Sequence, residues 1–501
     1  MKTHAHTTRL AAKILDDITT KNSAYWKRRE QTSALTLFKE AAVRIPAYKD
    51  FLKQHDIDPR KITTWKQFQT VPITDKDTYL RQYSLAQLCF DGTLHKPMVF
   101  ASTSGSTGKP FYFPRDRELD WQQSVLNELF LKNTSLGTSS STLVIITFGM
   151  GVWIGGLINY QAFELVSNRG YPVSILTPGV NKDEVLKALR DLAPLYEQTV
   201  VVGYPPFVKD IIDDANVQEI PLKKFNLRFL FAAEAFTETF RDYISATAHV
   251  KNPLLDTLNI YGTADIGPMA FETPISILVR QYATKNKKIA ERLFFRKNAS
   301  PTFAQYNPHF ITFETLSENI LVTGNNIVPL IRYAIGDSGG VYSLGDIIEI
   351  FRSNDIDLLQ EARSKNIPIY SLPFVFVHER KDFSVKLYGA IIYPEHIREA
   401  LLDQSLVAHI TGKFSMQIKY NRKNNQYLQI HIELRPHTDA SRKLTRHIQK
   451  TIVHYLLQAN TEYHNNYTHF AKKVTPKISL ASYGSPDHFK IGIKQKWVEK
   501  I

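Results

Sequence analysis

Residues 142–148, TLVIITF, and residues 199–203, TVVVG, are the apolar runs that decide the fold class of this chain. Similar apolar runs occur at 173–176, 228–233 and 319–323. Helical patterns lie between them at 183–192 and 205–215. Short apolar strands that alternate with helices are typical of parallel sheets covered by helices. We therefore predict an α/β fold, with a large N-terminal domain of mostly parallel sheets flanked by helices over residues 1–379.

The segments on either side of this core have other patterns. Residues 1–80 are expected to be helical, because small and apolar residues recur there at the spacing of one helix face, at Ala34, Leu37, Phe38, Ala41 and Ala42. Late in the chain we expect a helix at 394–402, a hairpin of 415–420 and 427–434, a long helix from Asp439 and a strand at 474–480. This order predicts a separate small α+β domain over residues 380–501.

The composition is that of a globular protein. The 501 residues are 43% apolar and include one cysteine, Cys89, so an internal disulfide and a cysteine-based zinc site are excluded. The first twenty residues lack the apolar core of a secretory signal, and the apolar stretch at 143–158 is shorter than the roughly 20 residues that span a bilayer. We expect a cytoplasmic protein that does not cross a membrane.

Positive charge is concentrated at the C-terminal end. The net charge is +14, and residues 380–501 hold 20 lysines and arginines against 9 acidic residues. Such a basic region indicates an anionic partner: a nucleic acid, a membrane surface or a phosphate-rich small molecule. A solvated basic surface without a ligand is the alternative.

The strongest local motif is STSGSTGKP at residues 102–110, which follows a strand-like run at 98–100. Backbone N–H groups of small residues can converge on an anion, and Lys109 adds a positive charge. The residues of this predicted phosphate cradle are Ser104, Gly105, Ser106, Thr107, Gly108 and Lys109. The motif is not a Walker A loop, because Pro110 follows the lysine. A flexible Ser/Gly turn is the alternative.

Residues 102–110 resemble the phosphate loop of the adenylate-forming superfamily, particularly that of phenylacetate-CoA ligase. Further segments resemble that ligase in the same order over nearly the whole chain: VRIPAY at 43–48, VPI at 71–73, FGMGVWIGG at 148–156, AAEAFT at 232–237, YGTADIGP at 261–268, PLIRYAIGD at 329–337, and RKD at 380–382 with Gly389 and Pro394. Ala235 stands where proline is usual, and Asp265 stands where glutamate is usual.

The resemblance implies a nucleotide site. The phosphate loop, with Thr107, would hold the β- and γ-phosphates of ATP, and Asp265 would bind the Mg²⁺ that bridges them. Because aspartate is one methylene shorter than glutamate, a water-bridged metal is the alternative to direct coordination. Asp337, predicted in a Gly-Asp-Ser-Gly-Gly turn with Arg380 nearby, would accept hydrogen bonds from the ribose hydroxyls. The adenine would lie against Tyr261, Gly262, Thr263, Ala233 and Glu234, and the acyl pocket would contain Phe148, Gly149, Trp153 and Tyr204.

The resemblance also implies that the C-terminal domain moves. It would rotate about a hinge at Asp382 and carry a lysine into the site for adenylation only. Lys490 fits this role best by its position after a Gly/Pro-containing loop, Lys494 is the reserve, and Lys386 is a second catalytic candidate.

These residues lead to a functional hypothesis with alternatives. The first is ATP-dependent, AMP-forming activation of an organic carboxylate, an aromatic acid among the candidates, followed by transfer to coenzyme A. The second keeps the adenylation and transfers the acyl group to an amine, a hydroxyl or a carrier protein. The third is a non-catalytic binding protein on the same scaffold. In the first hypothesis, lysines of the basic C-terminal region would contact ATP or the phosphates of the acceptor, so no nucleic-acid partner is expected.

Overall fold

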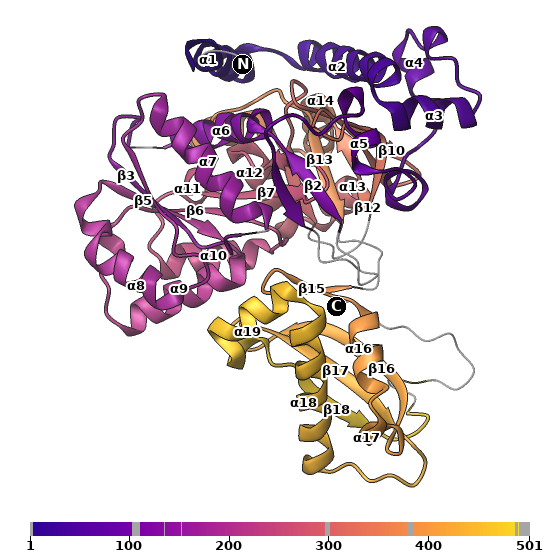
Figure 1. The fold of residues 1–501 in the computed structure, drawn as a ribbon. Helices are drawn as coiled ribbons and strands as arrows, with labels where there is room; N and C mark the ends of the chain where they lie inside the picture. Colours follow the sequence, from indigo (N-terminus) through magenta and orange to yellow (C-terminus); the bar gives the residue numbers. More distant parts are fainter. Residues whose placement is uncertain are drawn as a thin grey trace.

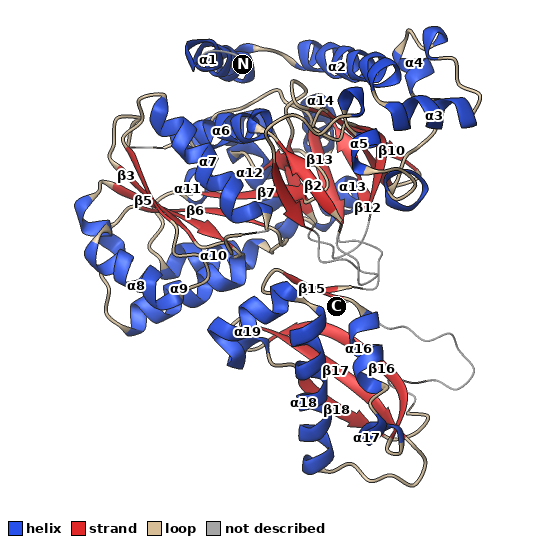
Figure 2. Cartoon of the chain, in the orientation of Figure 1, coloured by secondary structure: helices blue, strands red, loops and turns tan. Residues whose placement is uncertain are grey.

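The computed structural model describes residues 4–102, 111–134, 136–151, 153–295, 301–378, 384–485 and 489. N-terminal helices lie along one side of a large mixed sheet, and a smaller unit formed after residue 384 lies at the other side (Figure 1). Helices cover both faces of the large sheet (Figure 2). The described part of the chain contains no helix with the length and apolar character needed to cross a bilayer.

The N-terminal segment is helical, as predicted. It contains α1 (His4–Thr20), α2 (Ser23–Arg44), α3 (Pro46–Gln54), α4 (Trp65–Phe68) and α5 (Leu85–Leu88). Asn22 starts α2 by accepting a hydrogen bond from the Tyr25 amide, and Pro46 starts α3, where its missing N–H costs nothing. The five residues expected on one face of α2 are all buried there. They pack into an apolar cluster with the sheet.

The centre of the large part is an eleven-stranded sheet within the described residues. Its strands are β3 (Thr142–Ile146), β4 (Val173–Leu176), β5 (Gln198–Gly203), β6 (Leu227–Ala232), β7 (Thr257–Thr263), β8 (Gly267–Phe271), β9 (Thr302–Gln305), β10 (Ile311–Leu316), β11 (Asn319–Gly324), β12 (Leu330–Tyr342) and β13 (Phe374–His378). Their order is β10-β11-β12-β13-β9-β8-β7-β6-β5-β3-β4. The α/β fold class is confirmed, but the large sheet is mixed and not mostly parallel as expected.

The two halves of this sheet pair differently. From β4 to β7 all neighbours are parallel, as the alternation predicts, whereas from β7 to β10 they are antiparallel. The reason lies in the connections. Residues 264–266 join β7 to β8 and residues 317–318 join β10 to β11, and links this short permit only antiparallel pairing.

Alternating residues of the parallel strands pack against helices on opposite faces. Leu143, Ile145 and Val201 face one cluster, and Val144 and Val200 face another. The helices of the large part are α6 (Arg117–Lys132), α7 (Ile154–Asn168), α8 (Lys182–Asp191), α9 (Pro205–Val217), α10 (Glu238–Thr247), α11 (Pro253–Asp256), α12 (Pro274–Lys285), α13 (Lys287–Phe294), α14 (Leu344–Arg352) and α15 (Leu358–Ser364). α8, α9 and α10 contribute to the first cluster, and α6 and α7 to the second.

The C-terminal unit contains the predicted helix, hairpin, long helix and strand. Its elements are β14 (Val385–Leu387), β15 (Ala390–Ile392), α16 (Pro394–Leu401), α17 (Gln404–Val407), β16 (Ile410–Tyr420), β17 (Gln426–Leu434), α18 (Arg442–Ala459), α19 (Thr461–Val474) and β18 (Lys477–Ala481). Leu444, Ile448, Ile452 and Leu456 recur every four residues, which predicts one buried face; Ile448, Ile452 and Leu456 are buried on α18, and Leu444 is half-buried. Helix α19 was not predicted, although Tyr463, Tyr467, Phe470 and Val474 recur at the three- and four-residue spacing of one helix face.

Candidate active site

The predicted phosphate loop falls between two paired strands. β1 (Val99–Ser102) and β2 (Tyr112–Arg115) are antiparallel, with Ser102 opposite Tyr112. The cradle residues 104–109 lie outside the described residues, as do Arg380, Asp382 and Lys490. Their roles stay predictions.

Asp265 lies in the short link between β7 and β8, where its side chain is buried. The Tyr333 hydroxyl of β12 donates a hydrogen bond of 2.6 Å to Oδ2, and Lys76 Nζ is 3.3 Å from the same oxygen. Lys76 Nζ also lies 5.5 Å from the centroid of the Phe113 ring on β2. The Lys76 ammonium group therefore lies between the Asp265 carboxylate and β2, the strand that follows the phosphate loop.

Lys76 is held in place by its own turn. It opens the π-helical turn Lys76–Leu80, which Asp75 caps by accepting from the amides of Asp77 and Thr78. Two residues earlier, Thr74 pairs with β12: the Ala334 amide donates to the Thr74 carbonyl at 2.8 Å. Sequence reasoning missed both Lys76 and Tyr333 as partners of Asp265.

A resident magnesium ion does not fit the described residues well. Mg²⁺ bound by one carboxylate needs free carboxylate oxygens, water and substrate phosphates. The Asp265 carboxylate is already paired with Lys76 and Tyr333, so a metal here would have to displace Lys76 or bind through water.

Tyr261 and Asp337 meet near the same edge of the sheet. The Tyr261 hydroxyl, on β7, donates a hydrogen bond of 2.5 Å to Oδ2 of Asp337. The prediction that Asp337 lies in a turn is wrong, because it lies within strand β12. Gly336 has φ +84° and the register with β11 shifts here, so the strand continues through a bulge that turns the Gly-Asp pair without ending pairing.

The segment predicted to line the adenine edge contacts the C-terminal unit. Ala233 has φ +74°, a left-handed conformation that is strained for a residue with a Cβ. Its carbonyl accepts from Lys386 Nζ at 3.0 Å. The carboxylate of Glu234 accepts from the Gly389 amide at 2.6 Å and from Gln426 Nε2 at 3.5 Å. The side chain of Glu234 thus faces the second unit, and the predicted role of the Ala233–Glu234 backbone at the adenine edge stays a prediction.

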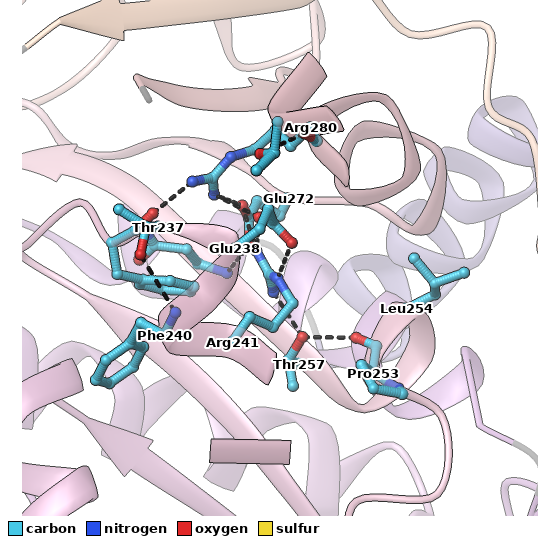
Figure 3. A network of polar contacts seen from close by, with 12 residues as sticks. Thr237, Glu238, Phe240, Arg241, Pro253, Leu254, Thr257, Glu272 and Arg280 are labelled. Carbon is cyan, nitrogen blue, oxygen red and sulfur yellow. Dashed lines mark hydrogen bonds and ion pairs between the residues drawn. The ribbon is translucent and has the colours of Figure 1, made fainter. Parts of the chain in front are cut away.

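A buried network of ion pairs contacts residues 233–237 (Figure 3). Arg241 Nη2 lies 2.8 Å from Glu272, and Arg280 Nη1 lies 2.5 Å from the same carboxylate. Arg241 Nε also pairs with Glu238 at 2.9 Å, and Arg280 donates to the carbonyl of Phe236. Burial alone would raise the pKa of Glu238, but Arg241 and Arg280 outweigh it and hold that pKa below its usual value.

The network balances its charges, with two guanidinium groups facing two carboxylates, all buried. Because Arg280 also binds the Phe236 carbonyl, the network ties residues 233–237 to β8 and α12. Asn259 on β7 adds a second tie by donating to the Glu234 carbonyl at 3.2 Å. Such ties offset the strain at Ala233.

The four predicted acyl-pocket residues lie together. Phe148 is buried with its ring edge-on to Tyr204, at 4.7 Å between centroids. Gly149, Trp153 and Tyr204 line one cavity, which the C-terminal unit closes with Tyr388, Ala390, Glu462, Asn465 and Asn466. Glycine is required at 389, because a Cβ there would lie 2.4 Å from the Tyr204 ring and the backbone has φ +84°.

Other contacts between the units use part of the basic charge of the C-terminal region. Lys473 on α19 pairs with Asp210 on α9 at 2.9 Å, and the Phe207 and Phe470 rings stack at 5.4 Å. Lys209 donates to Asn425 in the β16–β17 turn at 2.8 Å. At least one lysine of the basic region therefore has an acidic partner within the chain.

The sequence matches no protein-family model and no curated protein. Among solved structures, the chain is similar to a 2-hydroxyisobutyryl-CoA ligase in complex with 2-HIB-AMP and CoA in the thioesterification state, with 15% identity, 96% of this chain and 90% of that chain covered, and a TM-score of 0.65. An open conformation of the ligase gives 14% identity over 95% and 91% of the two chains, and its postadenylation state gives 13% over 97% and 92%. Their TM-scores are 0.52 and 0.53. The described chain therefore has the mixed α/β fold of the adenylate-forming ligases.

Proposed function

We propose that this chain is an AMP-forming acid–thiol ligase that resembles phenylacetate-CoA ligase. In the first half-reaction an organic carboxylate attacks the α-phosphorus of ATP, supplied as its magnesium complex, and forms an acyl-adenylate and pyrophosphate. In the second half-reaction the thiol of coenzyme A takes the acyl group and releases AMP. An aromatic acid is among the candidate substrates, and a cytoplasmic location stays a prediction.

One observation carries this proposal: distant segments of the nucleotide motif meet at the carboxyl ends of β6 and β7. The Ala233–Glu234 segment follows β6, Tyr261 reaches Asp337 across to β12, and Asp265 follows β7. Ligands of open α/β sheets bind at such carboxyl ends. Lys76 adds the positive charge that a reaction between two anions needs.

The residues have separate proposed tasks. Asp337 and Tyr261 would bind the ribose hydroxyls and the adenine, and the phosphate loop with Lys76 would neutralise the developing pyrophosphate charge. The acyl group would bind against Gly149, Trp153 and Tyr204, where the cavity of about 10 Å³ has room for about one water molecule and would have to widen. The proposed hinge at Asp382 and the proposed adenylation lysine, Lys490, are left to experiment.

Exchange of radioactive pyrophosphate into ATP, measured with a panel of aliphatic and aromatic acids, tests the first half-reaction. Exchange that depends on one acid supports the proposal, and coenzyme A-dependent release of AMP with that acid supports thioester formation. AMP release that follows an added amine, alcohol or carrier protein, and not coenzyme A, moves the acceptor to the second class. Absence of exchange with every acid, together with salt-sensitive retention on DNA or RNA, points to a binding protein.

A further inference from the structure

Glu462, in the first turn of α19, lines the cavity between the two units. The cavity wall from the large unit includes Trp153 and Tyr204, and the wall from the C-terminal unit includes Glu462 and Asn465. The Ile391 amide donates to Glu462 Oε2 at 3.4 Å. A carboxyl group of the C-terminal unit thus joins the predicted acyl pocket of the large unit.

The surroundings of Glu462 differ from those of the other carboxyl groups near it. Burial raises the pKa of Glu462 to about 7, against the lowering effects of the Ile391 amide and Lys386. Asp210 is paired with Lys473, and Glu234 accepts from Gly389 and Gln426. Among the described residues, no lysine, arginine or histidine forms an ion pair with Glu462.

The titratable groups facing this position come from every element around it. Lys386 comes from β14, Tyr388 from the β14–β15 turn, and Tyr204 from the start of α9. Burial raises the pKa of Tyr204 and that of Tyr388, so both phenols stay neutral around pH 7. Glu462 is therefore the group in this cavity that gains or loses a proton near neutral pH.

We propose that Glu462 accepts the proton of the acceptor nucleophile in the transfer half-reaction, an inference that rests on the proposed function. The thiol sulfur of coenzyme A attacks the carbonyl carbon of the acyl-adenylate. The C–S bond forms, the C–O bond to the phosphate breaks with its electron pair, and AMP leaves as an anion. The thiol proton moves to the Glu462 carboxylate and from there to water.

This assignment has a chemical reason. A free thiol has a pKa of roughly 8.5 and is mostly protonated at neutral pH, so its attack benefits from a base. A base whose pKa lies near the working pH is the most effective proton acceptor. Because Glu462 belongs to the C-terminal unit, the base is present at the acyl pocket only in an arrangement like the one seen here. The higher TM-score against the thioesterification state agrees with that arrangement.

The test uses the full chain and separates the two half-reactions. The acid that drives pyrophosphate exchange is first converted to its adenylate, and coenzyme A is then added in single-turnover experiments from pH 6 to pH 9. In Glu462→Gln, transfer should fall about 100-fold and pyrophosphate exchange should fall much less, because only transfer moves the thiol proton. The rise of the wild-type transfer rate around pH 7 should shift toward the ionisation of the thiol itself. His464→Gln, two residues further along α19 and exposed, is the matched control and should leave both half-reactions unchanged.

Each outcome has one meaning. Transfer by Glu462→Gln at the wild-type rate and with the wild-type pH profile overturns this inference and leaves the proposed function intact. A slower transfer with an unchanged pH profile also overturns it, because the residue then acts only structurally. If Glu462→Gln misfolds, Glu462→Asp replaces it and should retain the pH-dependent rise at a lower rate; loss of that rise counts against the inference. Wild-type protein that forms no adenylate with any acid overturns the proposed function, and this inference with it.

Discussion

Two regions near residues 233–237 bury carboxyl groups in opposite ways. In the ion network, Glu238 and Glu272 face Arg241 and Arg280, and the pKa of Glu238 is lowered. In the cavity between the units, Glu462 faces a backbone amide, and burial raises its pKa to about 7. The first arrangement fixes charge permanently, whereas the second leaves a proton free to exchange. The comparison separates a region that positions a site from a region that can take part in chemistry.

The two regions also differ in what separation of the units would do to them. All four residues of the network belong to the large unit, so it persists in any arrangement of the C-terminal unit. The cavity needs both units, because Glu462 and Tyr204 come from different ones. Variants that break one region and spare the other test this difference.

The largest effect is expected from Glu272→Gln. The change leaves the guanidinium groups of Arg241 and Arg280 to share Glu238, and loss of one partner from a buried ion pair costs about 3–5 kcal/mol. Urea denaturation should show this fall in the free energy of unfolding. The control is Glu349→Gln in the exposed pair with Arg352, where the change should stay within about 0.5 kcal/mol. Equal losses in both variants would contradict the special role of the network.

A smaller but more selective effect is expected from Lys76→Ala. The change removes the cation beside Asp265, and loss of a preorganised charge-stabilising group should slow adenylation roughly 100-fold. Transfer from a supplied acyl-adenylate should stay near the wild-type rate, because no pyrophosphate charge develops in that step. Pyrophosphate exchange and single-turnover transfer measure the two rates. Lys66→Ala, an exposed lysine of α4, is the control, and equal damage to both half-reactions would refute the assignment.

The sequence predicts the parallel strands well because their signal is local. The apolar runs around β3 and β5 and the face of α2 depend on neighbouring residues, and the structure confirms them. Helix α19 has a local pattern too, at Tyr463, Tyr467, Phe470 and Val474, and this pattern was missed because three of the four are aromatic residues among polar ones. Asp337 was predicted in a turn because its glycine-rich neighbours favour one, but pairing with β11 and β13 keeps it in a strand.

The site was less predictable, because its contacts join distant residues. Lys76 and Asp265 are separated by 189 positions, and Asp265 and Tyr333 by 68. No periodicity links such pairs. Glu462 carries no sequence signal either, since an acidic residue in a first helical turn is ordinarily solvated. The capping residue Asn460 is a further local feature that marks the start of α19.

A moderate effect on transfer is expected from Glu234→Gln. Hydrogen bonds to a charged acceptor contribute roughly 1.5–3 kcal/mol, and the neutral amide would keep part of the bond from the Gly389 amide. We therefore expect transfer to slow about 10-fold, with adenylation unchanged. Single-turnover transfer measures the effect. Glu184→Gln, an exposed carboxylate of α8, serves as control, and unchanged transfer in Glu234→Gln would mean that this contact does not hold the units together.

The smallest effect concerns Glu30 of α2, which sharpens the comparison because it is a titratable carboxyl far from the cavity. Burial raises its pKa to about 7, although the Tyr306 hydroxyl donates to it at 2.5 Å. The folded state therefore favours the protonated form. Its contribution to stability is complete below the unfolded-state pKa of roughly 4.3 and is lost as the pH rises through about 7.

Glu30→Gln stays neutral at every pH, so its unfolding free energy should fall less than that of the wild type between pH 4.5 and pH 7.5. We expect a difference of about 1 kcal/mol, below the full linkage value, because the side chain is partly exposed. Burial lowers the pKa of His309 to about 4, so protonation of His309 lowers the free energy of unfolding as the pH falls. The variant is therefore compared with the wild type at each pH. Urea denaturation measures the effect, with Glu40→Gln on the exposed side of α2 as control. The pH profile of transfer should be the same in Glu30→Gln and the wild type. If the pH profile of transfer in Glu30→Gln changes as it does in Glu462→Gln, a carboxyl group far from the cavity has the same effect on transfer. The assignment of proton transfer to the cavity would then fail.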